Sequence, residues 1–109
     1  MADAQTPPSA LAGFQRKHLR KLAHDLKPVV SVGEGGLSPA VGRALDEALA
    51  RHELVKVKMH QPEDKKAAAA ELARMGSAEL CGLVGHVVIL YRRNDENPRI
   101  EVPQRAGTE

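Results

Sequence analysis

The segment 33–36 has the sequence Gly-Glu-Gly-Gly and could bind an anion through its backbone. It follows the short β-branched run 29–32 and precedes Ser38-Pro39, a typical helix start with serine as the cap and proline in the first turn. Successive backbone N–H groups before a helix form a concave anion site, and glycine lets a phosphate approach closely because it has no side chain. The candidate phosphate-binding residues of this loop are Gly33, Glu34, Gly35 and Gly36.

Two familiar phosphate-binding loops do not fit this segment. A P-loop needs a Lys-Ser/Thr pair after the glycines, and none follows. The third glycine of a dinucleotide-binding fingerprint would fall on Ser38. The alternative interpretation is a tight turn from strand to helix, which needs no ligand.

A second candidate feature is a helix with an almost single-signed charged face. Residues 13–28 contain five Lys or Arg residues and one acid, Asp25, while Leu19 and Leu22 lie on the opposite, apolar side of the predicted helix. A charged run is often only a solvated face, but this one lacks the Glu–Lys pairs of an ordinary surface helix and therefore favours binding. The candidate residues are Arg16, Lys17, Arg20, Lys21 and Lys27.

The segment 54–60, LVKVKMH, alternates between apolar and polar residues and predicts a strand with one buried face. Lys56, Lys58 and His60 share its polar face. The two lysines allow two interpretations. They could protect an edge strand against aggregation, or they could extend the basic patch of the helix.

Composition limits the kinds of partner. The chain has 109 residues, 42% of them apolar, and a net charge of +2, which suits one domain with a local basic patch. Aromatic residues make up only 2%, as Phe14 and Tyr91. Folds that bind single-stranded RNA by stacking bases on exposed aromatic rings are therefore excluded. RNA would be held mainly through phosphates, sugars and backbone amides.

Other function classes lack support in the sequence. Cys81 is the single cysteine, which suits a reducing cytosol, and its apolar surroundings predict a core position. No signal peptide and no apolar run of about 18 residues is present, so we expect a cytoplasmic protein without a membrane partner. The five histidines show no metal-ligand spacing, and no catalytic set is visible. We expect no metal, no cofactor and no enzymatic activity.

The predicted elements alternate between helix and strand. Helices are expected from Ser9 to near Pro28, from Ser38 to His52 and over 62–76, with strands at 29–32, 54–60, 78–84 and 87–91. The order α-β-α-β-α-β-β predicts an α/β two-layer sandwich with a mixed sheet of about four strands. Residues 100–103 could add an edge strand. The expected divisions are a disordered tail at 1–8, one domain at 9–103 and a tail at 104–109.

Several stretches together resemble the CRM domain family. They are LAGFQRKHLRKLAHDLKPVVSVGEGGLSPAV at 11–41 (with Ala12 where the family pattern has threonine), HELVKVK, GLVGHVVILYRR and IEVP. The resemblance covers about Leu11 to Pro103 and is nearest to the free-standing bacterial YhbY-type RNA-binding proteins. It implies a fold similar to the C-terminal domain of translation initiation factor three, with a KH-like GxxG loop at 33–36 and the basic helix beside it. It also implies association with ribosomal RNA in precursors of the large ribosomal subunit.

Glu34 departs from the family pattern, because such loops usually carry polar or basic residues between the outer glycines. We expect its side chain to turn outward and contact Lys or Arg of the first helix. Two hypotheses stand at this point. The chain is a monomeric module for structured RNA, or it binds an acidic protein partner through the same basic surface. Nuclease treatment of a pull-down distinguishes them.

Overall fold

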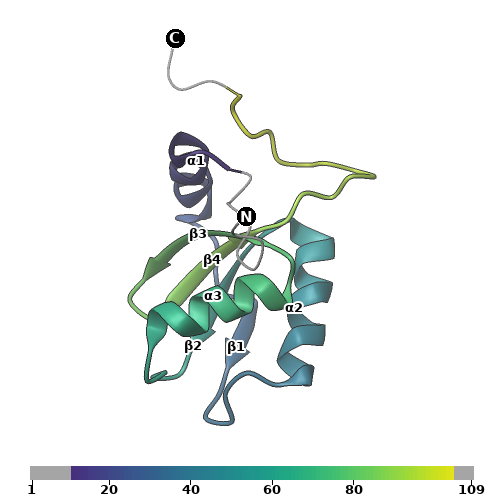
Figure 1. The fold of residues 1–109 in the computed structure, drawn as a ribbon. Coiled ribbons are helices and arrows are strands. Elements are labelled where there is room, and N and C mark those ends of the chain that lie inside the picture. The colour runs from purple at the N-terminus through teal and green to yellow at the C-terminus, as the bar shows by residue number, and fades with distance from the viewer. Residues whose placement is uncertain (1–10, 105–109) are drawn as a thin grey trace, which may run out of the picture.

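The computed structural model describes residues 11–104 and has the predicted α/β class. Within these residues, three helices and four strands follow one another in the expected order (Figure 1). The elements are α1 (Gly13–Ala23), β1 (Val30–Val32), α2 (Pro39–His52), β2 (Leu54–Met59), α3 (Lys65–Met75), β3 (Glu79–Val84) and β4 (Val87–Tyr91). The predicted tail at 1–8 lies outside the described residues, as does the predicted tail at 104–109 apart from Gln104.

The four strands form one mixed sheet in the order β1-β2-β4-β3. β1 pairs with β2 in parallel, and the other two pairs are antiparallel. The predicted four-stranded mixed sheet is therefore confirmed. Because β2 lies between β1 and β4, the interpretation of Lys56 and Lys58 as edge-strand protection is wrong.

The helices are divided between the two faces of the sheet, which differs from a simple two-layer arrangement (Figure 1). α2 and α3 cover one face, and α1 with the C-terminal segment covers the other. The physical reason is that β2 and β4 carry apolar side chains on both faces. The α2/α3 side buries Leu45, Leu49, Val57, Leu72 and Leu90, and the α1 side buries Leu19, Ala23, Leu54, Ile89 and Tyr91.

α2 begins at the predicted Ser38 cap, whereas α3 begins at Lys65, after the predicted start at 62, with Asp64 as its N-cap. The Ser38 hydroxyl accepts a hydrogen bond from the N–H of Val41 at 3.3 Å, and the Asp64 carboxylate accepts one from Ala67. α1 begins later than predicted, at Gly13, with Ala12 as its N-cap. The side-chain oxygen of Gln15 accepts the N–H of Ala12 at 2.8 Å and so closes the first turn. The predicted cap, Ser9, lies outside the described residues.

The predicted hairpin between β3 and β4 is confirmed. Val84 pairs with Val87, and Gly85 occupies the turn with φ of +60°, a conformation that favours glycine. The predicted edge strand near the C-terminus is wrong, because residues 100–103 form no strand. The N–H of Ile100 donates instead to the carboxylate of Glu53, and Ile100 packs beside the α1-side core.

Within residues 11–104, no helix is both long and apolar enough to cross a membrane. The same part of the chain holds no group of three or more His, Cys, Asp or Glu side chains placed to share a metal ion.

Candidate nucleic-acid interface

Two arginines of α1 are hydrogen-bonded to backbone carbonyls of the protein, Arg16 as a half-buried residue and Arg20 as an exposed one. The guanidinium of Arg16 donates to the carbonyl of Leu11 at 2.6 Å, and that of Arg20 donates to the carbonyl of Cys81 in β3 at 2.8 Å. These acceptors are neutral, so both side chains keep their positive charge at fixed positions. Replacing them would therefore disturb packing as well as charge.

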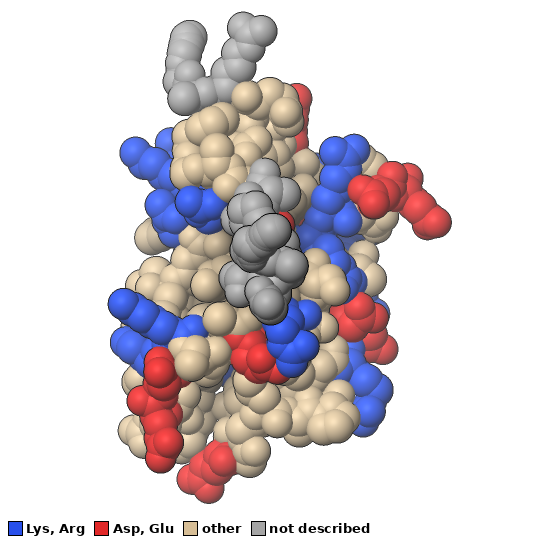
Figure 2. Space-filling view, in the orientation of Figure 1, with Lys and Arg blue, Asp and Glu red and all other residues tan. Residues whose placement is uncertain are grey.

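The exposed cations of this region without a hydrogen bond described above are lysines. Lys17 and Lys21 lie on the solvent side of α1, and Lys27 follows in the segment that leads to β1. Figure 2 shows Lys and Arg side chains gathered over α1 at the upper left, whereas positive and negative side chains are interspersed lower down. These lysines are therefore the part of α1 that a polyanion could reach most directly.

The polar face of β2 continues this basic surface across the sheet. The ammonium of Lys56 donates to the carbonyls of His24 at 3.3 Å and Leu26 at 3.0 Å, which ties β2 to the C-terminal end of α1. Lys58 is exposed and pairs with Ser31 of β1 in the sheet register. At the usual strand rise, Lys56 and His60 are about 13 Å apart along β2. The strand therefore spans the distance from α1 to the glycine loop.

The glycine loop is a turn that leaves space for a ligand. The N–H of Gly36 donates to the carbonyl of Gly33 at 3.0 Å, and Gly36 has φ of +75°. A Cβ at Gly33 or Gly35 would meet no atom within 4 Å, so the backbone surface is open. The Gly36 amide closes the turn, so it is not free to donate to a phosphate in this conformation.

Glu34 does not contact α1, contrary to expectation. Its carboxylate lies 3.5 Å from Nε2 of His60, the residue that follows β2, and its side chain is 88% exposed. The loop also does not lie beside α1: it stands at the bottom of the sheet in Figure 1, with α1 at the top. The reason is the direction of β1, which begins near the end of α1 and carries the chain away from it.

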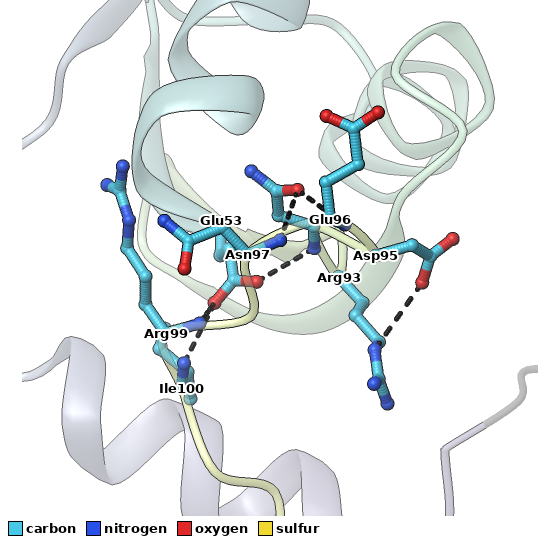
Figure 3. Close-up of polar contacts among 8 residues, drawn as sticks. Glu53, Arg93, Asp95, Glu96, Asn97, Arg99 and Ile100 are labelled. Carbon is cyan, nitrogen blue, oxygen red and sulfur yellow. Dashed lines mark hydrogen bonds and ion pairs between the residues drawn. The ribbon is translucent and has the colours of Figure 1, made fainter.

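Glu53 is a structural residue that the sequence patterns did not single out. It ends α2 with φ of +65°, and its side chain is 1% exposed. Its carboxylate accepts the N–H groups of Asn94 at 2.7 Å and of Arg99 and Ile100 at 2.9 Å (Figure 3). Burial alone would raise the pKa of Glu53, but these three hydrogen bonds and the charge of Arg99 lower it below its ordinary value.

Cys81 occupies the core position that its surroundings predicted. It is buried under α1, and burial raises the pKa of its thiol to about 12, with the nearby Glu79 adding to the effect. Since the thiolate is the reactive form, this cysteine is a packing residue at neutral pH.

Comparisons with known proteins identify the family of the chain. Residues 11–92 match the CRS1 / YhbY (CRM) domain. The chain belongs to the CRM domain family, as the sequence resemblance predicted.

Similar proteins carry names that refer to RNA. The chain is 37% identical over 95 residues to "Probable RNA-binding protein YqeI" of Bacillus subtilis, covering 85% of this chain and 99% of that protein. It is 34% identical over 99 residues to an "RNA-binding protein" of Haemophilus influenzae, covering 89% and 99%. The solution structure of a hypothetical protein from Staphylococcus aureus has a TM-score of 0.76 and 35% identity, covering 85% of this chain and 99% of that chain.

Proposed function

We propose that this protein binds structured RNA through one continuous surface. The surface runs from the exposed lysines of α1 over the polar face of β2 to the glycine loop. In the cell, the proposed target is ribosomal RNA in precursors of the large ribosomal subunit, whose assembly the protein assists as a cytoplasmic monomer. The observation that carries the proposal is the alignment of these features on the α1 side of the sheet.

The distribution of charge on this surface supports RNA as the ligand. Lys17, Lys21 and Lys58 are exposed, and the neighbouring Lys56 and Arg20 bind only neutral carbonyls through the contacts described above. A polyanion could therefore follow the surface without displacing a carboxylate from these anchored cations. The names of the relatives support the same ligand, and the resemblance to YhbY-type proteins supports the ribosomal target.

We expect RNA affinity to depend strongly on salt. If about four to six phosphates are neutralised, log K falls with log salt at a slope of roughly −3 to −5. Changing Lys17 and Lys21 together to Ala should flatten this slope by about one to two, because both side chains are exposed and their loss removes phosphate contacts without a buried partner. Fluorescence anisotropy of a labelled RNA hairpin across a salt series measures this.

The matched control is the pair Lys65 and Lys66 in the first turn of α3, both changed to Ala. These lysines are also exposed and also lie in one helix, but α3 covers the other face of the sheet. The control should leave the slope unchanged. A flat slope for the unmodified chain, or equal losses in both double variants, would contradict binding through the α1 surface.

The ribosomal part of the proposal predicts a distinct sedimentation pattern. The protein should co-sediment with precursors of the large subunit rather than with translating ribosomes, and its deletion should raise the ratio of free subunits to complete ribosomes. Nuclease treatment before the gradient should release the protein from these fractions. Retention after complete digestion of RNA would instead favour the acidic protein partner.

A further inference from the structure

A hollow of about 250 Å³ lies between α1 and the β3–β4 hairpin, on the same side of the sheet as the exposed lysines. Its floor is aliphatic and consists of Val84, Val87 and Ile89. Arg20, His24 and Lys56 stand around it. Val84 is 64% exposed, the highest value among the large exposed apolar side chains of residues 11–104. An apolar floor with a few basic side chains at its rim is the composition typical of a ligand-binding hollow.

The cations at the rim are held in place before any ligand binds. The stem of Arg20 crosses β3 at Gly82, where a Cβ would come within 2.7 Å of it, and its guanidinium is bound to the carbonyl of Cys81. Lys56 is fixed by the carbonyls of His24 and Leu26. Gly82 therefore provides the space for the aliphatic stem of Arg20, a residue that lines the hollow.

The hollow also lies on the path proposed for the RNA backbone. Val87 is directly opposite Lys58 in the β2–β4 register, and Ile89 is opposite Lys56. Directly opposed residues on antiparallel strands lie about 4.5–5.5 Å apart at Cβ. A strand of RNA that contacts Lys21 and Lys58 would thus pass over the aliphatic floor.

We propose that this hollow receives one unpaired nucleobase of the bound RNA, an inference that rests on the proposed function. Its volume is below the roughly 300–1,000 Å³ of clefts that hold drug-sized ligands, so the occupant is small. The guanidinium of Arg20 can stack on a base in a chain that has almost no aromatic residues. The cationic rim suits the phosphates on either side of the base, which favours a nucleotide over an apolar side chain of a protein.

The test uses two RNA hairpins that differ only in one bulged nucleotide, which is complete in one and lacks its base in the other. The backbone and charge are the same in both, so their affinity ratio reports the base alone. We expect the unmodified chain to bind the complete bulge about tenfold more tightly, a preference in the range of single-base stacking. Val84→Asn, which removes the apolar contact without adding charge, should reduce the ratio to about twofold. Arg20→Lys keeps the positive charge but lacks the planar guanidinium, and this variant should also reduce the affinity ratio.

The matched control is Val29→Asn, since Val29 is 53% exposed and lies in a different hollow, which Leu22 and Leu26 also line. This variant should keep the full ratio. Equal binding of both hairpins by the unmodified chain overturns the inference and leaves the proposed function standing. Binding of neither hairpin overturns both. A ratio that is unchanged in Val84→Asn also overturns the inference, because the base would then be bound outside this hollow.

Discussion

Glu53→Gln is expected to lower the melting temperature by about 10 °C or more. The substitution keeps the size of the side chain and the positive φ of the backbone but replaces one carboxylate oxygen with an NH₂ group. That group would face an N–H donor, either of Asn94 or of the Arg99-Ile100 pair, so at least one buried donor loses its acceptor. A cost of about 2–3 kcal/mol is expected for losing a hydrogen bond to a charged group. Thermal unfolding followed by circular dichroism measures it.

The pH dependence of stability in the unmodified chain and in Glu53→Gln gives an independent check. The pKa of Glu53 is lower in the folded chain than its ordinary value of 4.5. Its contribution to stability is therefore complete above that value and is lost as the pH falls through the folded-state pKa. The difference in unfolding free energy between the unmodified chain and Glu53→Gln should be largest at neutral pH and should shrink below about pH 4.5.

The matched control is Glu101→Gln, an exposed carboxylate in the same C-terminal segment. It should change the melting temperature by no more than about 1–2 °C, because surface substitutions usually stay within about 0.5 kcal/mol. A Glu53→Gln protein whose melting temperature stays within about 1–2 °C of the unmodified chain would contradict the role assigned to the three hydrogen bonds.

Local signals were sufficient to predict the elements from the sequence. Ser38-Pro39 marks the start of α2, the alternation in 54–60 marks β2, and the Gly85-His86 connection marks the hairpin. Each of these depends on residues that are close together in the chain. The burial of Cys81 could be predicted for the same reason, since its immediate neighbours are apolar.

Contacts between distant segments could not be predicted in the same way. The partner of Glu34 is His60, and the two meet only because β1 and β2 pair in parallel and end at the same edge. Arg20 and Lys56 looked like free charges, whereas their acceptors are backbone carbonyls that the fold brings to them. Glu53 gave no signal, because its three donors lie more than forty residues away in an irregular segment.

Substitutions at neighbouring positions of the glycine loop should change RNA affinity in opposite directions. Gly35→Asp should weaken binding about tenfold or more, because a carboxylate would then stand where the backbone is open to phosphate. The melting temperature should stay nearly unchanged, since a Cβ at Gly35 meets no atom within 4 Å and the φ there is not positive. Glu34→Lys should tighten binding about threefold to thirtyfold, because it replaces repulsion with attraction at the same loop. Anisotropy titrations at low and moderate salt measure both.

Two further variants separate the effect of charge on RNA affinity from the effect of its position in the loop. Glu34→Gln removes the negative charge without adding a positive one and should give an intermediate gain. Glu47→Lys makes the same charge change as Glu34→Lys on the exposed side of α2, and it should have little effect if the loop contacts RNA directly. The gain in Glu34→Lys should also come with weaker discrimination between RNAs, because a phosphate contact adds affinity for any sequence. If Gly35→Asp binds normally and Glu34→Lys gains no more than Glu47→Lys, the loop is only a turn. RNA would then be held by α1 and β2 alone.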